Sequence, residues 1–320
     1  MADLLKVKDL KVSFRTDGEV VPAVGGVSFD VQRGEIHSLV GESGCGKSVT
    51  ALSLLRLIPS PPGRIEGGEV WWQGRNLLAE PRAEIVRLRG QAISFIFQEP
   101  LTSFNPVQRI GEQIGEVLQI HSGMSIKQSR DLVLEKLARV GLPDPVRQYQ
   151  AYPHELSGGM RQRAMIAMAL ISRPDLLIAD EPTTALDVTI QAQIMELIRE
   201  LQAEYQMSVL LITHNLGIVA ETAQRVSVMY CGKVVEQAPI RDLFKSPLHP
   251  YTQGLLDSVP KITDREELRA IPGMIPDPLQ LPTGCYFAPR CGRAKQICQR
   301  EYPPETLRDG CHRVSCWLYD

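Results

Sequence analysis

The sequence predicts an α/β protein with a parallel sheet, followed by a small C-terminal extension that contains cysteines. Two observations predict the sheet: helical patterning over 187–205, and short apolar runs at 36–40, 176–180 and 208–214. Short apolar strands that alternate with helices are typical of a parallel sheet covered on both faces. The third observation predicts the extension over 246–320, where prolines become frequent, periodicity fades and five of the seven cysteines lie.

The composition is that of a globular protein with a sizeable core. Its 43% hydrophobic and 22% charged residues are typical of globular proteins. The length of 320 residues favours more than one domain. The formal net charge of −2 gives no support to a broad surface for nucleic acid or anionic lipid. No apolar stretch approaches the roughly 18–20 residues of a membrane span, and the first residues lack the layout of a secretion signal. We therefore expect a cytoplasmic chain, in which cysteines serve as thiols or metal ligands.

The elements follow in order from local patterns. Residues 5–40 alternate apolar and polar side chains around Asp-Gly and Arg-Gly turn signals, which predicts β-strands. A helix is expected from about 48 to 58, because prolines begin at Pro59. Residues 66–98 again have the composition of strands, and residues 105–172 are patterned as helices.

The stretch GESGCGKSV predicts a phosphate-binding loop, because it matches G-x-x-x-x-G-K-S/T between a strand and a helix. Absent side chains let backbone N–H groups surround phosphate oxygens, and the helix start adds the positive end of its dipole. We expect Lys47 to reach the β- and γ-phosphates and the Ser48 hydroxyl to ligate Mg²⁺. The residues expected to contact the nucleotide here are Gly41, Glu42, Ser43, Gly44, Cys45, Gly46, Lys47, Ser48 and Val49.

Polar residues end three of the predicted strands. Asp180 and Glu181 follow LLIA, so Asp180 is expected to hold the Mg²⁺ shell and Glu181 to activate the attacking water as general base. His214 ends SVLLIT and is expected to hold the water and the γ-phosphate, while Gln98 closes AISFIF and is expected to sense Mg²⁺ and water. Each residue taken alone is also typical of a solvated strand end, and the upstream loop favours the catalytic interpretation.

The stretch LSGGMRQR predicts a second anion-binding helix start, opened by Ser157, Gly158 and Gly159. These two phosphate-binding elements lie about 110 residues apart. Either both bind one nucleotide, or the second binds the nucleotide of a partner subunit. Here the sequence resembles the ATP-binding cassette proteins of ABC transporters. Those proteins work as head-to-tail dimers, with ATP between the phosphate loop of one subunit and the signature of the other.

The resemblance covers nearly the whole chain, with the motifs in the expected order. It implies an ABC-type P-loop nucleotide-binding domain over 1–245, with a RecA-like parallel core, an antiparallel β subdomain and a helical subdomain at about 100–172. It also makes Gln98 the glutamine loop and TALD, residues 184–187, a dimer contact. These are implications of the resemblance and not of the residue patterns alone.

Two further positions take their meaning from the same resemblance. Phe14 matches the aromatic residue that stacks on adenine in these proteins, with a place in the hydrophobic core as the alternative. Asn215 departs from the Asp that many relatives have after the histidine, which puts only the fine tuning of His214 in doubt.

Two stretches, DEPTTALDVTIQAQI and SPLHPYTQGLL, are similar to the ATPases of oligopeptide and dipeptide importers, which carry a C-terminal extension. The cysteine spacing C-x5-C-x6-C-x17-C is unlike the tight pairs common in zinc sites, and four thiolates suit an iron–sulfur cluster equally well. In that family the matching cysteines resemble those that ligate a 4Fe–4S cluster. They are Cys285, Cys291, Cys298 and Cys316. Zinc and free thiols remain alternatives, and Cys311 is either a spare thiol or a competing ligand.

The resemblance implies an ATP-hydrolysing subunit that uses ATP and Mg²⁺ on the cytoplasmic face of the inner membrane and powers uptake of di- or oligopeptides. The implied partners are two transmembrane permease subunits, a second homologous ATPase and an extracytoplasmic peptide-binding protein, with no nucleic acid. One alternative is the same motor for nickel chelates or opines. Another is an ABC ATPase that acts on nucleic acid or the ribosome, a class that usually carries two cassettes, a coiled coil or zinc insertions, and a basic face, none of which is visible here. A third is a soluble cassette in iron–sulfur assembly, a class that is shorter and lacks the HPYT segment.

Overall fold

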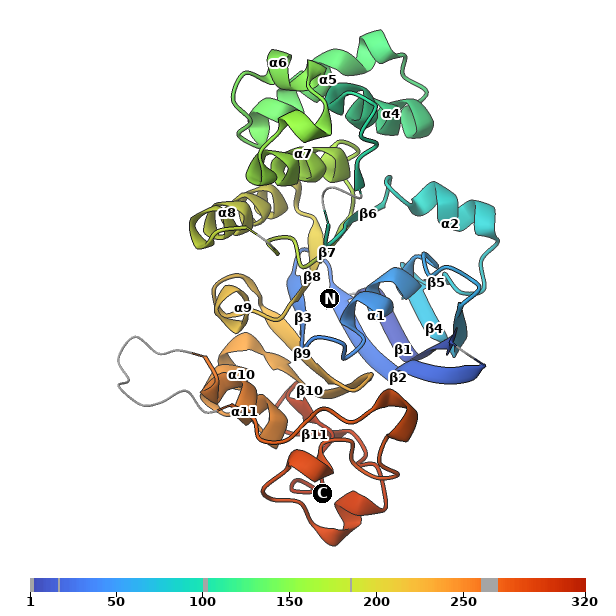
Figure 1. The fold of residues 1–320 in the computed structure, drawn as a ribbon, viewed down its shortest axis with the longest axis vertical. Coiled ribbons are helices and arrows are strands. Elements are labelled where there is room, and N and C mark those ends of the chain that lie inside the picture. The colour runs from blue at the N-terminus through green and yellow to red at the C-terminus, as the bar shows by residue number, and fades with distance from the viewer. Residues whose placement is uncertain (1–2, 17, 100–102, 185, 260–269) are drawn as a thin grey trace. The chain divides into compact units, whose positions relative to one another are not determined.

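The computed structural model describes residues 3–16, 18–99, 103–184, 186–259 and 270–320 (Figure 1). They form helices together with parallel and antiparallel strands, so the predicted α/β class is confirmed. The chain divides into two compact units, Met1–Glu80 with Thr213–Asp320, and Pro81–Ile212. The C-terminal extension belongs to the first unit, and a separate domain beginning at residue 246 stays a prediction. Among the described residues, no helix combines the length and apolar character needed to span a membrane.

The first unit begins with an antiparallel sheet in the order β2-β1-β4-β5. Its strands alternate buried and exposed residues because one face packs on the core and the other meets water. The alternation over 5–40 therefore predicts the first two strands of the chain correctly. Their bounds are Asp3–Thr16 for β1, Glu19–Gln32 for β2, Gly63–Trp72 for β4 and Arg75–Asn76 for β5.

The other strands of the first unit lie in the order β11-β12-β10-β9-β3. Every residue of β3, Ile36–Val40, is buried, and β3 pairs in parallel with β9, Arg225–Tyr230. The remaining pairs are antiparallel and comprise β10, Lys233–Pro239, β11, Thr306–Leu307, and β12, Arg313–Val314. Because β12 pairs with β10, backbone hydrogen bonds tie the C-terminal extension to this unit.

The helices of the first unit are short. The extension contributes one of them and three single-turn 3₁₀ segments, which fits its many prolines. The helices are α1, Lys47–Leu54, α9, Leu216–Thr222, α10, Ile240–Lys245, and α11, Pro250–Asp257. The 3₁₀ segments are η2, Pro278–Gln280, η3, Ala288–Arg290, and η4, Gln296–Gln299.

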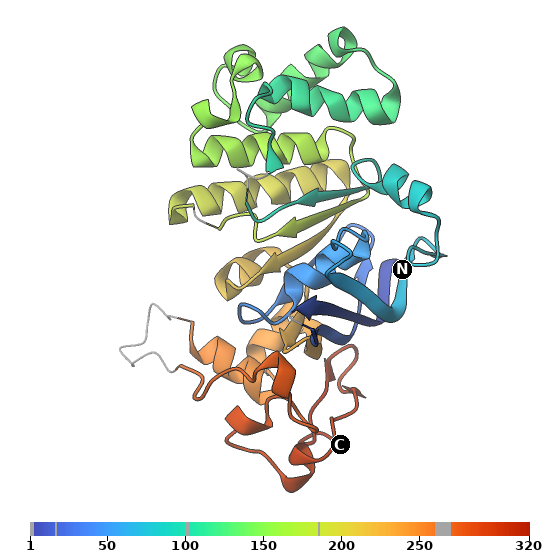
Figure 2. The same ribbon diagram turned by 45° about the vertical axis from the view of Figure 1, so that its right-hand side comes forward.

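The second unit contains the parallel strands β8-β7-β6 and most of the helices. Figure 2 shows α7 and α8 side by side beside these strands. The strands are β6, Ile93–Ile96, β7, Leu176–Asp180, and β8, Ser208–Thr213, whose last residue falls in the first unit. The helices are α2, Arg82–Leu88, α4, Ile110–Ser122, α5, Ile126–Arg139, α6, Pro145–Gln150, the 3₁₀ segment η1, Pro153–Glu155, α7, Gly158–Leu170, and α8, Val188–Tyr205.

Two local predictions need correction. The helix expected over 48–58 ends at Leu54, because Arg56 adopts a left-handed backbone with φ of 52°, which no helix continues through. The strand-rich reading of 66–98 misses α2, which begins directly after Pro81 and buries Ile85. The proline directly before the helix is the signal that identifies it.

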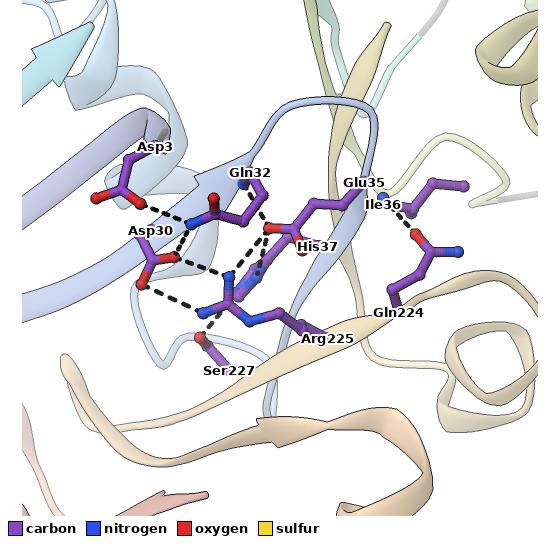
Figure 3. Close-up of polar contacts among 9 residues, drawn as sticks. All are labelled: Asp3, Asp30, Gln32, Glu35, Ile36, His37, Gln224, Arg225 and Ser227. Carbon is purple, nitrogen blue, oxygen red and sulfur yellow. Dashed lines mark hydrogen bonds and ion pairs between the residues drawn. The ribbon is translucent and has the colours of Figure 1, made fainter. Parts of the chain in front are cut away.

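A buried polar network joins β2, β3 and β9 in the first unit (Figure 3). The Arg225 guanidinium contacts Asp30 at 2.8 Å and Glu35 at 3.2 Å. Burial favours a neutral Asp30, but hydrogen bonds from Arg225 and Gln32 outweigh it and hold the pKa of Asp30 below its ordinary value. His37 lies inside this network, with Nε2 2.9 Å from the Ser227 hydroxyl (Figure 3).

The buried His37 predicts that the protein loses stability in mild acid. Burial and then the charge of Arg225 lower its pKa from 6.5 to about 3, so the folded protein keeps it neutral. A group whose pKa is lower in the folded state stabilises above its unfolded pKa, and this stability is lost as pH falls from 6.5 toward 3. At pH 5 the expected loss from His37 is about 2 kcal/mol.

Urea unfolding at pH 7 and pH 5 measures this loss. In His37→Gln the drop in unfolding free energy between the two pH values is expected to be smaller by about 2 kcal/mol. The control is His154→Gln, since His154 is exposed and its replacement should leave the drop unchanged. An equal drop in His37→Gln and wild type would contradict the assignment.

Candidate nucleotide-binding and catalytic site

The predicted phosphate loop follows β3 and leads into α1, as its motif requires. A Cβ atom at Gly41 would lie 2.3 Å from the Met229 carbonyl oxygen, so no larger residue fits. Gly46 has φ of 99°, and a Cβ there would lie 2.5 Å from the Ala23 carbonyl oxygen. Both glycines are therefore required by the close approach of neighbouring backbone.

The Lys47 side chain is held inside this loop. Lys47 is only 5% exposed, and its Nζ donates to the carbonyl oxygens of Gly41 at 2.8 Å and Glu42 at 3.0 Å. The Cys45 thiol lies 3.8 Å from the same Nζ, and burial raises the pKa of Cys45 above its ordinary value. The loop thus places a buried ammonium beside a neutral thiol, which suits the binding of an anion.

A cavity of about 550 Å³ adjoins the loop within the first unit. Phe14 lines it together with Ser43, Gly44 and Val49, so the structure brings the predicted adenine-stacking residue to the same space as the loop. Further lining residues come from the C-terminal extension: Ile275, Pro276, Asp277, Pro278 and Leu281. Reasoning from the sequence missed this wall, because no motif marks it.

In the second unit, β7 ends at the buried Asp180, and Glu181 turns the chain. Glu181 has φ of 46°, a left-handed conformation that costs an ordinary residue about 1–2 kcal/mol. Its backbone N–H donates to the Ile212 carbonyl oxygen at 2.9 Å, which holds this conformation. Backbone strain of this kind concentrates at functional sites.

Two side chains orient the Glu181 carboxylate. The Thr184 hydroxyl donates to Oε2 at 2.8 Å, and the Gln98 amide donates to the same oxygen at 3.2 Å. The structure therefore brings the Gln98 and Glu181 side chains together, while their catalytic roles stay predictions. It adds Thr184, which sequence reasoning assigned only to a dimer contact. The position of Thr184, three residues after Glu181 in the same turn, is the sequence signal for this contact.

The predicted signature opens α7. The Ser157 hydroxyl accepts a hydrogen bond from the Met160 N–H at 3.3 Å and so caps the helix. Gly158 and Gly159 follow in the first turn, where a Cβ on Gly159 would lie 3.1 Å from the Ile190 side chain. The glycines keep the remaining N–H groups of this helix start accessible, which is the requirement for binding an anion.

His214 follows β8 and is exposed at the start of α9. The next residue, Asn215, accepts hydrogen bonds from the N–H groups of Gly217 at 3.0 Å and Ile218 at 3.3 Å. Asn215 therefore caps α9 as well as an Asp does. The phosphate loop, Phe14 and His214 belong to the first unit, whereas Gln98, Glu181, Asp180 and Ser157 belong to the second.

The cysteines of the extension are free thiols. The Cys285 N–H donates to the Cys298 carbonyl oxygen at 2.8 Å, and the Lys295 N–H points to the Cys298 sulfur at 3.4 Å. Within the residues described, no three His, Cys, Asp or Glu side chains are grouped closely enough to hold one metal ion. Cys311 is exposed.

The other four thiols affect one another electrostatically. Burial raises the pKa of Cys285 to about 11, and charges on Cys298 and Cys316 raise it further. Burial also raises the pKa of Cys316, to which charges on Cys291 and Cys298 add. Backbone N–H groups oppose this by donating to the sulfurs, from Phe287 and Ala288 to Cys285 and from Leu318 to Cys316.

Comparison with protein families gives two matches. The family described as ABC transporter matches residues 24–184, and the family described as oligopeptide/dipeptide transporter, C-terminal region, matches residues 235–298. The first includes the phosphate loop, Gln98, the signature and Glu181. The second includes three of the four cysteines named above.

Curated relatives match along the whole chain. The dipeptide transport ATP-binding protein DppD of Bacillus subtilis is 50% identical, over 100% of this chain and 96% of its own length. The oligopeptide transport ATP-binding protein OppD of the same organism is 48% identical, over 98% of this chain and 88% of its own. Among solved structures, the ATP-binding cassette MJ0796, a dimer bound to ADP and phosphate, gives a TM-score of 0.66 at 28% identity, over 74% of this chain and 99% of that one.

Proposed function

Because the chain belongs to the ABC transporter family, and within it to the ATP-binding proteins of peptide importers, we propose that it powers the uptake of di- or oligopeptides by hydrolysing ATP. The observation that carries this proposal is the pairing of an ABC cassette with the peptide-transporter C-terminal region in one chain. Relatives that are 50% identical over 96% and 98% of their own length are dipeptide and oligopeptide transport ATP-binding proteins.

The first unit binds the nucleotide. Phe14 stacks on adenine in the 550 Å³ cavity, and the loop N–H groups and Lys47 bind the phosphates. Lys47 exchanges its bonds to loop carbonyl oxygens for bonds to the β- and γ-phosphates. Ser48, Gln98 and Asp180 are the residues that would hold Mg²⁺, since hydroxyl, amide and carboxylate oxygens are its preferred ligands. Mg²⁺ would neutralise charge that develops on the phosphates.

Glu181 is the general base. Thr184 and Gln98 donate to one of its carboxylate oxygens, which orients the side chain, and the carboxylate accepts a proton from the attacking water. His214 holds that water and the γ-phosphate. This division of labour uses residues of both units of the chain.

The signature acts on the nucleotide of a second, homologous ATPase. The start of α7 offers N–H groups and the Ser157 hydroxyl, and ATP bound to the partner's phosphate loop supplies the anion they bind. The related cassette MJ0796 forms a dimer with ADP and phosphate bound, which supports a dimer of ATPases here. Two transmembrane permeases contact the helices that follow Gln98, and an extracytoplasmic binding protein delivers the peptide. The chain then works on the cytoplasmic face of the membrane.

Extraction of the tagged chain in mild detergent tests this function. Two permeases and a second ATPase are expected to purify with it, and peptide-loaded binding protein should stimulate ATP hydrolysis by the assembly. Recovery with ribosomes, nucleic acid or iron–sulfur assembly proteins would contradict the proposal. A binding protein that carries nickel chelates or opines would keep the motor and change the cargo.

The extension is proposed to hold a 4Fe–4S cluster on Cys285, Cys291, Cys298 and Cys316. The proposal is supported by four free thiols and by backbone N–H groups directed at three of their sulfurs, which would stabilise thiolate ligands. Among the described residues no three of these side chains are grouped around one ion position, so loading the cluster would have to draw the four cysteines together. When bound, the cluster would cross-link four separate parts of the extension. Cys311, which is exposed, is left out of the proposed ligand set.

Replacing Cys291 by serine is expected to remove most of the iron and the brown absorbance from anaerobically purified protein, because one of four thiolates is lost. The matched control is Cys311→Ser, which should keep both. Iron and sulfide analysis with the visible spectrum measures the change. Iron and colour that persist in Cys291→Ser, or zinc in place of iron in the wild type, would contradict the ligand assignment.

A further inference from the structure

Glu42 of the phosphate loop is bound by the C-terminal extension through its backbone and its side chain. Its N–H donates to the Tyr251 hydroxyl at 2.9 Å. Its carboxylate accepts hydrogen bonds from two nitrogens of the Arg290 guanidinium, at 2.8 and 3.2 Å. Its carbonyl oxygen accepts from Lys47 at 3.0 Å. One residue of the loop thus connects the phosphate-binding lysine with two side chains from about 210 and 250 residues further along the sequence.

The Arg290–Glu42 pair is a buried and geometrically constrained contact. The Arg290 side chain is 4% exposed and that of Glu42 is 25% exposed. Arg290 also donates to the carbonyl oxygens of Pro272 at 3.1 Å and Ile271 at 3.4 Å, which fixes the guanidinium in the extension. Two parallel bonds from a fixed guanidinium give a carboxylate one orientation.

Aromatic packing supports the same contact. The Tyr251 ring lies 4.6 Å from the Tyr230 ring and 5.5 Å from the Phe287 ring, measured between centroids. All three residues are at most 3% exposed. The Arg290 guanidinium lies 5.8 Å from the Tyr230 ring. The segment 285–291, which carries two of the proposed cluster ligands, therefore contacts the phosphate loop through Arg290 and packs on Tyr251 through Phe287.

We propose that Arg290 and Tyr251 are positioning residues for the phosphate loop, through which the C-terminal extension sets the affinity for nucleoside triphosphate. The proposal rests on the nucleotide site proposed above. Arg290 neutralises the Glu42 carboxylate, which would otherwise place a negative charge in a loop that binds an anion. Tyr251 accepts the Glu42 N–H and fixes the backbone whose carbonyl oxygen holds Lys47.

A double-mutant cycle on the full-length chain tests the proposal, with the dissociation constant of a fluorescent ATP analogue and Mg²⁺ as the readout. Arg290→Gln should weaken binding about tenfold, in the range typical of coupled sites, because the Glu42 charge is no longer neutralised. Glu42→Gln combined with Arg290→Gln should bind within about threefold of wild type. A role limited to folding would leave the double variant as weak as the single one.

Two further variants complete the experiment. Tyr251→Phe keeps the ring and removes the acceptor, so a rise of about threefold in the dissociation constant is expected, and it stands in for Arg290→Gln should that variant fail to fold. Arg313→Gln removes an exposed ion pair with Glu305 in the same extension, 3.6 Å long, and should leave binding unchanged.

The outcomes separate this inference from the proposed function. If the wild type binds the ATP analogue, and Arg290→Gln and Tyr251→Phe bind it with the same dissociation constant, the positioning role alone is overturned. Equal weakening in the single and double Arg290 variants would overturn it as well. A wild-type chain that binds no ATP analogue would instead contradict the proposed nucleotide site. In the assembled transporter, Arg290→Gln should raise KM for ATP and change kcat little.

Discussion

Glu181→Gln is expected to lower ATP hydrolysis by the assembled transporter by about 100- to 10,000-fold, the contribution typical of a general base. Glutamine has nearly the same shape and can still accept hydrogen bonds from Thr184 and Gln98 through its amide oxygen. It cannot take a proton from water. Because only the base is lost, the variant should bind ATP normally and accumulate as a closed ATPase dimer.

Phosphate release under saturating ATP measures the rate, and the amount of ATP retained after rapid gel filtration measures the closed state. The matched control is Glu200→Gln, since Glu200 is an exposed glutamate of α8 that pairs with Arg139 at 3.4 Å. That variant should hydrolyse ATP at the wild-type rate. Unchanged hydrolysis in Glu181→Gln would refute its role as base.

Ser157→Asp is expected to reduce hydrolysis by at least about 100-fold, the loss typical when donors to a developing anion are disabled. Aspartate caps helices as well as serine does, so the start of α7 should stay intact. The change places a negative charge where the γ-phosphate of the partner's nucleotide is proposed to bind. Binding of ATP to the isolated chain should be unchanged, because its own phosphate loop is untouched.

Ser157→Asn is the control for this variant. Asparagine is also a good helix cap but carries no charge, so its hydrolysis should fall only several-fold. Steady-state phosphate release from the assembled transporter compares the two. Equal rates of phosphate release in Ser157→Asp and wild type would contradict a role of the signature in ATP hydrolysis. Equal losses in the Asp and Asn variants would point to the shape of the helix start and not to charge.

Local patterns in the sequence predict the parts of this site that depend on nearest neighbours. The phosphate loop is recognisable because glycines, Lys47 and Ser48 must follow a buried strand within eight residues. The Asp180–Glu181 pair is recognisable because it ends a buried run, and the helix caps at Ser157 and Asp187 mark α7 and α8. Each of these is encoded over a few consecutive residues.

Contacts between distant segments are not encoded in that way. Arg290 and Glu42 lie 248 residues apart, and no local period of the extension indicates which side chain is buried. The cavity wall at Ile275–Leu281 and the pairing of β12 with β10 also join segments that lie far apart in the sequence. The extension was recognisable by composition as a separate segment, yet tertiary packing places it in the first unit with the phosphate loop.

The central claim is that each ATP is held by the phosphate loop of one chain and the signature of the other. Photolabelling with a reactive ATP analogue tests it in a transporter that carries Ser157→Asp in this chain and a wild-type partner ATPase. We predict that the partner loses trapped nucleotide while this chain keeps its label. Loss of label from this chain, with the partner labelled normally, would show that loop and signature act within one chain and would contradict the account.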